Sequence, residues 1–208
     1  MEDELKYIFS NVINWLRFAE EKNAALIALN GGILFATISL ISKNTNIISF
    51  ISADNLYSKL ALFYSYNFIL FVISGLLIAL LSFLPQTKVI GKFVSDSPKD
   101  DDNLLFYSHI MRYDAKKYLS KLSDSHNQES KTYSKSELDY ADQIVINSCI
   151  ATYKYLHFRV ALWFTISAIL SPVMGYILFF ILDSTNKKIK LSILLMYSIV
   201  FAILSLMR

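Results

Sequence analysis

The chain has 208 residues, of which 54% are apolar, and its formal net charge is +3. Water-soluble domains of this length are usually less apolar, and the charge is too small to favour nucleic acid as a partner. Cys149 is the only cysteine, which excludes an intrachain disulfide and a metal site built from cysteines.

Residues 1–23 predict an amphipathic helix outside the membrane. Its apolar side chains recur at spacings of three and four, so they share one face. They are Leu5, Phe9, Val12, Leu16 and Ala19. The acidic start suits the positive end of a helix dipole and is unlike a cleaved signal peptide. No breaker follows, so we expect this helix to continue into the membrane.

Four apolar stretches are long enough to cross a bilayer, because a hydrocarbon core about 30 Å thick needs roughly 20 residues of helix. The predicted spans are residues 24–42, 61–84, 158–182 and 191–207. Their unbroken apolar runs exclude the alternating strands of a membrane barrel. The predicted fold is therefore an all-α integral membrane protein with four transmembrane helices. A kink is expected at Pro172.

Small and polar residues inside the spans are expected to face neighbouring helices, where they permit close packing. They are Asn30, Gly31, Gly32, Asn67 and Gly75. A pore lined by Asn30 and Asn67 is the less favoured alternative.

Residues 86–157 form a polar segment between the second and third spans. A helix is predicted to follow Pro98. The carboxylates of Asp100–Asp102 are interpreted as its acidic first turn, because no second group of cation ligands accompanies them. Residues 123–133 are polar and predict a loop.

A third soluble helix is predicted to begin at Ser134, which has the spacing of a capping box with Glu137. It continues into the third span without Gly or Pro before Pro172, so one long helix is expected to leave the membrane as a stalk. The three soluble helices must bury their apolar stripes, which predicts a helical bundle. So small a bundle buries little core alone, so self-association is expected.

Four spans place both termini and residues 86–157 on one side of the membrane. Charge does not decide which side this is, because the short opposite loops also carry lysines.

Enzyme signatures are absent: the chain has no Gly-rich phosphate loop, no nucleophile elbow and no pair of histidines at helical spacing. We expect no catalytic residue and no bound metal. Aromatic and polar residues of the soluble helices are candidates for ligand binding, since aromatics stack bases and Arg112 suits a phosphate. Spacing alone favours the alternative of a bundle core with a surface arginine. The candidates are Trp15, Glu20, Lys22, Asn23, Asn103, Tyr107, Arg112, Asn147 and Lys154.

Three stretches carry a family resemblance by their order and their placement relative to the spans. They are WLRFAEEKNAAL (Trp15–Leu26) before a span, NLLFYSHI (Asn103–Ile110), and DQIVINSCIATYK (Asp142–Lys154) before another span. Together they resemble the transmembrane effector family of bacterial Pycsar anti-phage defence.

The resemblance implies a membrane effector that senses a cyclic pyrimidine nucleotide, cCMP or cUMP, made by a nucleotide cyclase during infection. This ligand would activate the effector, which then impairs the bacterial inner membrane and causes abortive infection. The resemblance also implies that residues 86–157 and both termini are cytosolic. Two alternatives remain open: a related effector that senses another nucleotide or a partner protein, and a membrane adaptor without a ligand.

Overall fold

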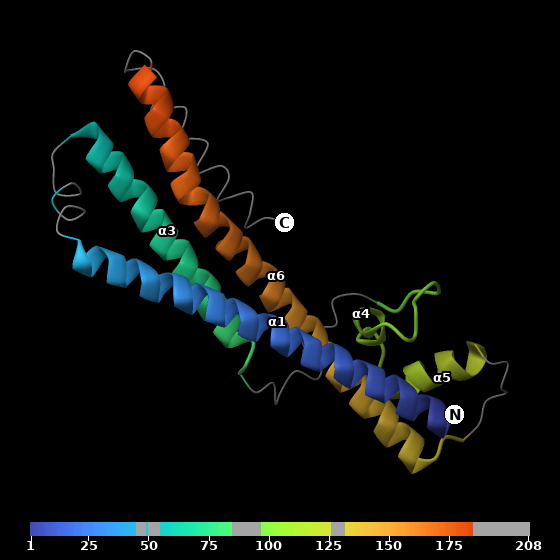
Figure 1. Cartoon of the computed structure of the whole chain (residues 1–208). Helices are drawn as coiled ribbons and strands as arrows, with labels where there is room; N and C mark the ends of the chain where they lie inside the picture. Colours follow the sequence, from blue (N-terminus) through green and yellow to red (C-terminus); the bar gives the residue numbers. More distant parts are fainter. Residues whose placement is uncertain (45–48, 50–54, 85–96, 126–131, 185–208) are drawn as a thin grey trace. The chain divides into compact units, whose positions relative to one another are not determined.

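The computed structural model describes residues 1–44, 49, 55–84, 97–125 and 132–184. Within these ranges the chain is helical and contains no strand, which confirms the predicted all-α class. The elements named in Figure 1 are α1 (Glu2–Lys43), α3 (Leu56–Leu81), α4 (Tyr107–Ile110), α5 (Ala115–Ser125) and α6 (Lys135–Ser184).

Both long helices are continuous, as the absence of breakers predicts. α1 runs for 42 residues from an acidic first turn, where Lys6 Nζ lies 2.9 Å from Glu2 Oε1. α6 runs for 50 residues and contains Pro172. The predicted capping box starts it: the Ser134 N–H donates to Glu137 Oε2 at 2.9 Å, and the Glu137 N–H donates to Ser134 Oγ at 3.2 Å. The kink at Pro172 stays a prediction.

The described chain divides into two compact units, and α1 and α6 each run through both. The first unit comprises Met1–Ala24 and Leu81–Phe158, and the second comprises Ala25–Leu80 and Arg159–Arg208. α1 and α6 therefore each start in the first unit and end in the second.

The first unit has an apolar core formed by α1, α4, α5 and the start of α6. α1 and α6 run parallel there, since Phe9 packs edge-on against Tyr140 and Trp15 against Tyr155. The buried core residues are Leu5, Ile8, Val12, Ile110, Tyr113, Tyr118, Leu119, Leu122, Ala141 and Ile144. Leu5 and Val12 of the stripe predicted on α1 belong to this set, and Phe9 packs against it, which accounts for the amphipathic pattern.

The single helix predicted after Pro98 is wrong. In its place the chain forms the short α4 and then α5, which starts where Asp114 Oδ1 accepts the Lys117 N–H at 2.8 Å. Asp114 thus caps a new helix, so two helices form where the apolar spacing predicted one. The interpretation of Asp100–Asp102 as an acidic first turn is also wrong, because no helix begins at those residues.

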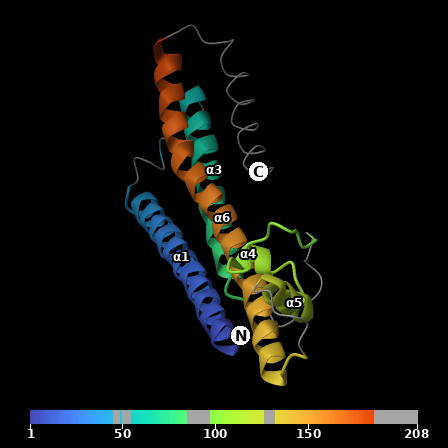
Figure 2. The same ribbon diagram turned by 90° about the vertical axis from the view of Figure 1, so that its right-hand side faces the viewer.

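In the second unit α3 lies antiparallel beside the later half of α6 (Figure 2). Tyr57 contacts Phe179 near one end, and Phe71 contacts Phe164 further along. α1, α3 and α6 are long and apolar enough to cross a membrane, which confirms three of the predicted spans by length and composition. The fourth, residues 191–207, lies outside the described residues.

Packing separates the small and polar residues of the spans into two groups. Asn30 is fully buried and donates to Thr165 Oγ1 at 2.9 Å, and a Cβ at Gly75 would lie 3.2 Å from the Ala161 carbonyl oxygen. The prediction that these two face a neighbouring helix is confirmed. For Gly31 and Gly32 it stays a prediction, since no atom of the described chain would lie within 4 Å of a Cβ at either. Asn67 donates to the Phe63 carbonyl of its own helix at 2.8 Å.

Candidate functional site

Three aromatic rings from distant parts of the sequence meet in the first unit. Tyr107 of α4 and Tyr155 of α6 stack with ring centroids 5.1 Å apart and planes 17° apart. Trp15 of α1 lies 5.7 Å from the Tyr107 centroid and 6.5 Å from that of Tyr155. Trp15 remains 40% exposed, so part of the indole is free to contact a ligand. We call these three residues the aromatic cluster.

Lys22 lies beside the aromatic cluster, two helical turns after Trp15 on the same face of α1. Its Nζ is 4.4 Å from the ring centroid of Phe18, 5.4 Å from that of Tyr155 and 5.3 Å from that of Phe158. Aromatic faces attract a cation through the ring quadrupole. Within the described chain no carboxylate pairs with this ammonium group.

Lys154 has the opposite surroundings, and its side chain is only 9% exposed. Its Nζ lies 3.0 Å from Glu20 Oε1 and donates to the Ser82 carbonyl at 2.9 Å. Ser82 directly follows the end of α3, where helix carbonyls lack intrahelical donors and the dipole favours a cation. Asn23 Nδ2 donates to the Lys154 carbonyl at 3.0 Å. We call Glu20, Asn23, Ser82 and Lys154 the lysine clamp, because they join α1, α6 and the end of α3.

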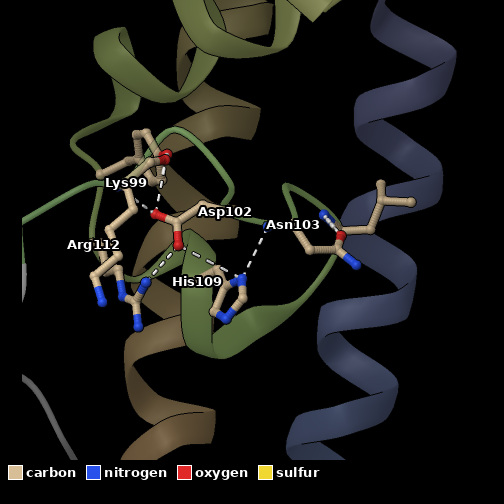
Figure 3. A network of polar contacts seen from close by, with 7 residues as sticks. Lys99, Asp102, Asn103, His109 and Arg112 are labelled. Atoms are coloured by element: carbon tan, nitrogen blue, oxygen red, sulfur yellow. Dashed lines mark hydrogen bonds and ion pairs between the residues drawn. The ribbon is translucent and has the colours of Figure 1, made fainter.

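A third set of contacts, centred on the Asp102 carboxylate, fixes the loop before α4 (Figure 3). The Asp102 side chain is 1% exposed and forms an ion pair with Arg112. The Lys99 N–H donates to Asp102 Oδ2 at 2.8 Å, and the Tyr113 hydroxyl donates to the same oxygen at 3.2 Å. These partners replace the water that the buried carboxylate has lost.

The same loop is folded by Asn103 and His109. The Asn103 N–H donates to His109 Nδ1 at 2.9 Å, and Asn103 Oδ1 accepts the Leu105 N–H at 2.9 Å. The imidazole nitrogen therefore acts as an acceptor in this arrangement. Figure 3 shows that both side chains belong to the segment that also supplies Asp102. Asn103 thus has a local structural role.

The pKa of several of these groups is displaced from its ordinary value. Burial alone would raise the pKa of Asp102, but the Lys99 N–H, the Tyr113 hydroxyl and the cationic Arg112 together lower it. Burial raises the pKa of Tyr107 and of Tyr155. Both phenols of the aromatic cluster are therefore neutral near pH 7, and each hydroxyl is a donor as well as an acceptor.

The structure brings six of the nine candidate residues together in two places. Trp15, Lys22 and Tyr107 belong to the aromatic cluster or its edge, and Glu20, Asn23 and Lys154 belong to the lysine clamp. The remaining three are separate. Asn103 and Arg112 belong to the Asp102 network, and Asn147 donates to the Gln143 carbonyl of its own helix at 2.7 Å.

The nine candidates do not include Tyr155 and Asp102. Tyr155 follows Lys154 directly, and its spacing alone favoured a place in the bundle core. Asp102 has no signal of its own, because the three neighbouring aspartates look alike in sequence and only the fold buries one. Among the described residues no group of His, Cys, Asp and Glu is arranged to hold a metal ion.

The fold and its clusters define an all-helical membrane protein in which helices with polar and aromatic contacts extend into bilayer-length apolar segments. The chain belongs to the Pycsar effector family, since the family model described as Pycsar effector protein domain matches residues 4–182. This match confirms the family resemblance noted in the sequence. No curated protein and no solved structure matches the chain.

Proposed function

We propose that this Pycsar effector senses a cyclic pyrimidine nucleotide, cCMP or cUMP, through its first unit and then impairs the bacterial inner membrane. In this proposal residues 86–157 and both termini are cytosolic, a nucleotide cyclase supplies the ligand, and the response is abortive infection. Family membership supports the anti-phage role and the link to a cyclase. The three bilayer-length helices support the membrane as the site of action.

The observation that carries the proposal is the continuity of α1 and α6. Each helix contributes to the aromatic cluster and the lysine clamp in the first unit, and each continues as an apolar helix in the second. A ligand that repacks these contacts acts directly on two helices that enter the membrane. It does so only through its different affinity for the resting and active arrangements.

Self-association is part of the proposal. The first unit is small, and beyond its core it leaves large apolar side chains exposed, among them Trp15, Phe18 and Leu105. Several copies acting together would turn small helix shifts into a larger breach of the bilayer. A ligand that binds the associated form more tightly also promotes association by mass action.

The first test measures thermal unfolding of the detergent-purified protein with cCMP, cUMP, cAMP and cGMP. The pyrimidine nucleotides are expected to raise the melting temperature and the purine nucleotides to leave it unchanged. A response to a purine nucleotide would favour a related effector for another messenger. A flat response to all four would favour a related effector that senses another nucleotide or a partner protein, or a ligand-free adaptor.

The second test measures release of a trapped dye from liposomes that contain the protein. Addition of the stabilising nucleotide is expected to increase release, while empty liposomes with nucleotide serve as the control. Binding without release would remove membrane impairment from the proposal and leave sensing in place.

A further inference from the structure

We propose that Lys22 and Trp15 form the ligand-anchoring subsite, in which Lys22 holds the anionic phosphate and Trp15 stacks on the base. This inference rests on the proposed function for the identity of the ligand. A cyclic mononucleotide has one negative charge and one flat heterocycle, so its smallest complementary site is one cation beside one accessible aromatic face.

Lys22 is a cation without a counter-ion among the residues that the structure describes. In the described part of the chain its ammonium group contacts only the rings of Phe18, Tyr155 and Phe158. Rings attract the cation without neutralising it, and they remove part of its water. An ammonium group in such surroundings gains more from an added anion than one fully hydrated on an open surface.

The other cations among the candidates are already paired. Lys154 is held by Glu20 and by the Ser82 carbonyl, and Arg112 is held by the buried Asp102. A phosphate at either position would have to displace a carboxylate of this chain. The structure therefore separates the candidate cations into one available for an anion, Lys22, and two that maintain the fold.

Trp15 is the exposed residue of the aromatic cluster, whereas Tyr107 and Tyr155 are half-buried. Tyr107 and Tyr155 stack on each other at 5.1 Å, which leaves no room for a base between them. Trp15 packs against both and remains 40% exposed. It lies two turns before Lys22 on the same helix face, with the exposed Phe18 between them.

Tyr155 supplies an independent polar observation. Its hydroxyl is buried and has no hydrogen-bond partner within the described chain, although its ring contacts both Trp15 and Lys22. Buried polar groups are ordinarily paired, and an unpaired one costs stability. The hydroxyl has no contact with solvent, so a ligand acceptor would satisfy it by repacking the rings around it, in line with the repacking invoked in the proposed function.

The deciding experiment measures cCMP and cUMP binding to the detergent-purified full chain by isothermal titration calorimetry. Lys22→Met is expected to weaken binding by tenfold or more, and Lys22→Arg to retain most of it. Trp15→Ala is expected to weaken binding by about tenfold, in line with the loss of one stacked base, and Trp15→Phe to lose less. Lys6→Met is the matched control, because Lys6 is an exposed lysine of α1 already paired with Glu2.

A second measurement does not need a nucleotide to bind. The rate of Lys22 acetylation by an amine reagent is followed by mass spectrometry, with and without inorganic phosphate, and Lys6 is the internal reference. Phosphate is expected to slow acetylation of Lys22 and not that of Lys6. Bound nucleotide is expected to protect Lys22 in the same way.

The outcomes distinguish this subsite from the proposed function. If the wild type binds a cyclic pyrimidine and Lys22→Met and Trp15→Ala bind it equally well, the subsite is wrong and the function stands. If no cyclic nucleotide binds but phosphate protects Lys22, the nucleotide function is wrong and the anion site stands. If neither binding nor protection occurs, both are overturned.

Discussion

The two units of this chain differ in where their large apolar side chains lie. The first unit packs apolar residues such as Leu5, Ile8 and Ile144 inside. The second exposes its large apolar side chains, with Phe35 at 75% and Tyr176 at 72%, and buries Asn30 and Thr165. The same helices, α1 and α6, take part in both arrangements.

The difference agrees with the surroundings proposed for the two units, water for the first and lipid for the second. Water drives apolar surface into a core, whereas lipid chains are as apolar as leucine and provide no such force between helices. Close packing and interhelical hydrogen bonds then hold the spans together. Along α1 the boundary between the two arrangements lies near Asn23 and Ala24, where the first unit ends.

The largest expected effect tests the apolar core of the first unit. Ile8→Ala removes a fully buried side chain and is expected to lower the free energy of unfolding by about 2–4 kcal/mol. Phe35→Ala, in the second unit, is the contrasting change and is expected to cost far less, because Phe35 faces the surroundings. Unfolding in detergent with added denaturant measures both. Equal losses would break the comparison between the units.

The second-largest expected effect tests Lys154, a charged residue that is buried in the first unit. Lys154→Met leaves Glu20 and the Ser82 carbonyl without their cation and is expected to destabilise the chain by about 1–3 kcal/mol. The half-exposed Glu20 remains partly hydrated, which places the loss below that of a fully buried pair.

Lys6→Met is the control for the loss of a lysine on α1. Its pairs with Glu2 and Asp3 are exposed and screened by solvent, so little or no change in stability is expected. Thermal unfolding of both variants decides the matter. If Lys154→Met were no worse than Lys6→Met, the lysine clamp would not hold α1, α6 and the end of α3 together.

Periodicity and the lack of breakers were enough to predict α1 and α6, because both properties are local. The capping box at Ser134 was predictable for the same reason. The break between α4 and α5 was not, since it depends on which aspartate the fold buries and which caps a helix. Asp102 and Asp114 have the same chemistry in sequence and opposite environments in the structure.

The candidate site shows the same limit. Trp15, Lys22 and Tyr107 were named from residue type and position beside a span. Their meeting with Tyr155 requires the parallel packing of α1 and α6, which no local pattern specifies. The pairing of Arg112 with Asp102 likewise became visible only in three dimensions, because the charge of an arginine is evident in sequence and its partner is not.

The third effect tests how the first unit holds a buried charge. The pKa of Asp102 is lower in the folded chain than the value of about 3.9 typical of unfolded chains. Its stabilising contribution is therefore complete above that value and is lost as the pH falls through the folded pKa. Asp102→Asn is expected to lose about 1 kcal/mol at pH 7, a typical net hydrogen-bond contribution.

The same substitution should make stability less sensitive to acid, because the titrating group is gone. Melting temperatures between pH 7 and pH 3 for the wild type and Asp102→Asn measure this. Asp114→Asn is a useful comparison, since the pKa of Asp114 is also lowered but its side chain is 57% exposed. Parallel pH curves for wild type and Asp102→Asn would contradict the stabilising role of the charge.

The smallest expected effect concerns the polar interior of the second unit. Asn30 Nδ2 donates to Thr165 Oγ1 at 2.9 Å, and the Thr165 hydroxyl donates to the Ala161 carbonyl at 2.9 Å. A double-mutant cycle with Asn30→Leu and Thr165→Val isolates the pair. Interhelical hydrogen bonds in membranes average about 0.6 kcal/mol, because each group also finds partners when the helices separate.

The coupling free energy is therefore expected near 0.6 kcal/mol when unfolding is measured in lipid bicelles. Gly75→Ala adds an independent check, since its Cβ would lie 3.2 Å from Thr165 Oγ1 and 3.4 Å from Asn30 Nδ2 and would press on the same pair. A coupling of several kcal/mol would mean that the second unit depends on polar contacts as strongly as the first depends on its apolar core. A coupling of zero would instead assign its cohesion to close packing, with Gly75→Ala then the most damaging of the three substitutions.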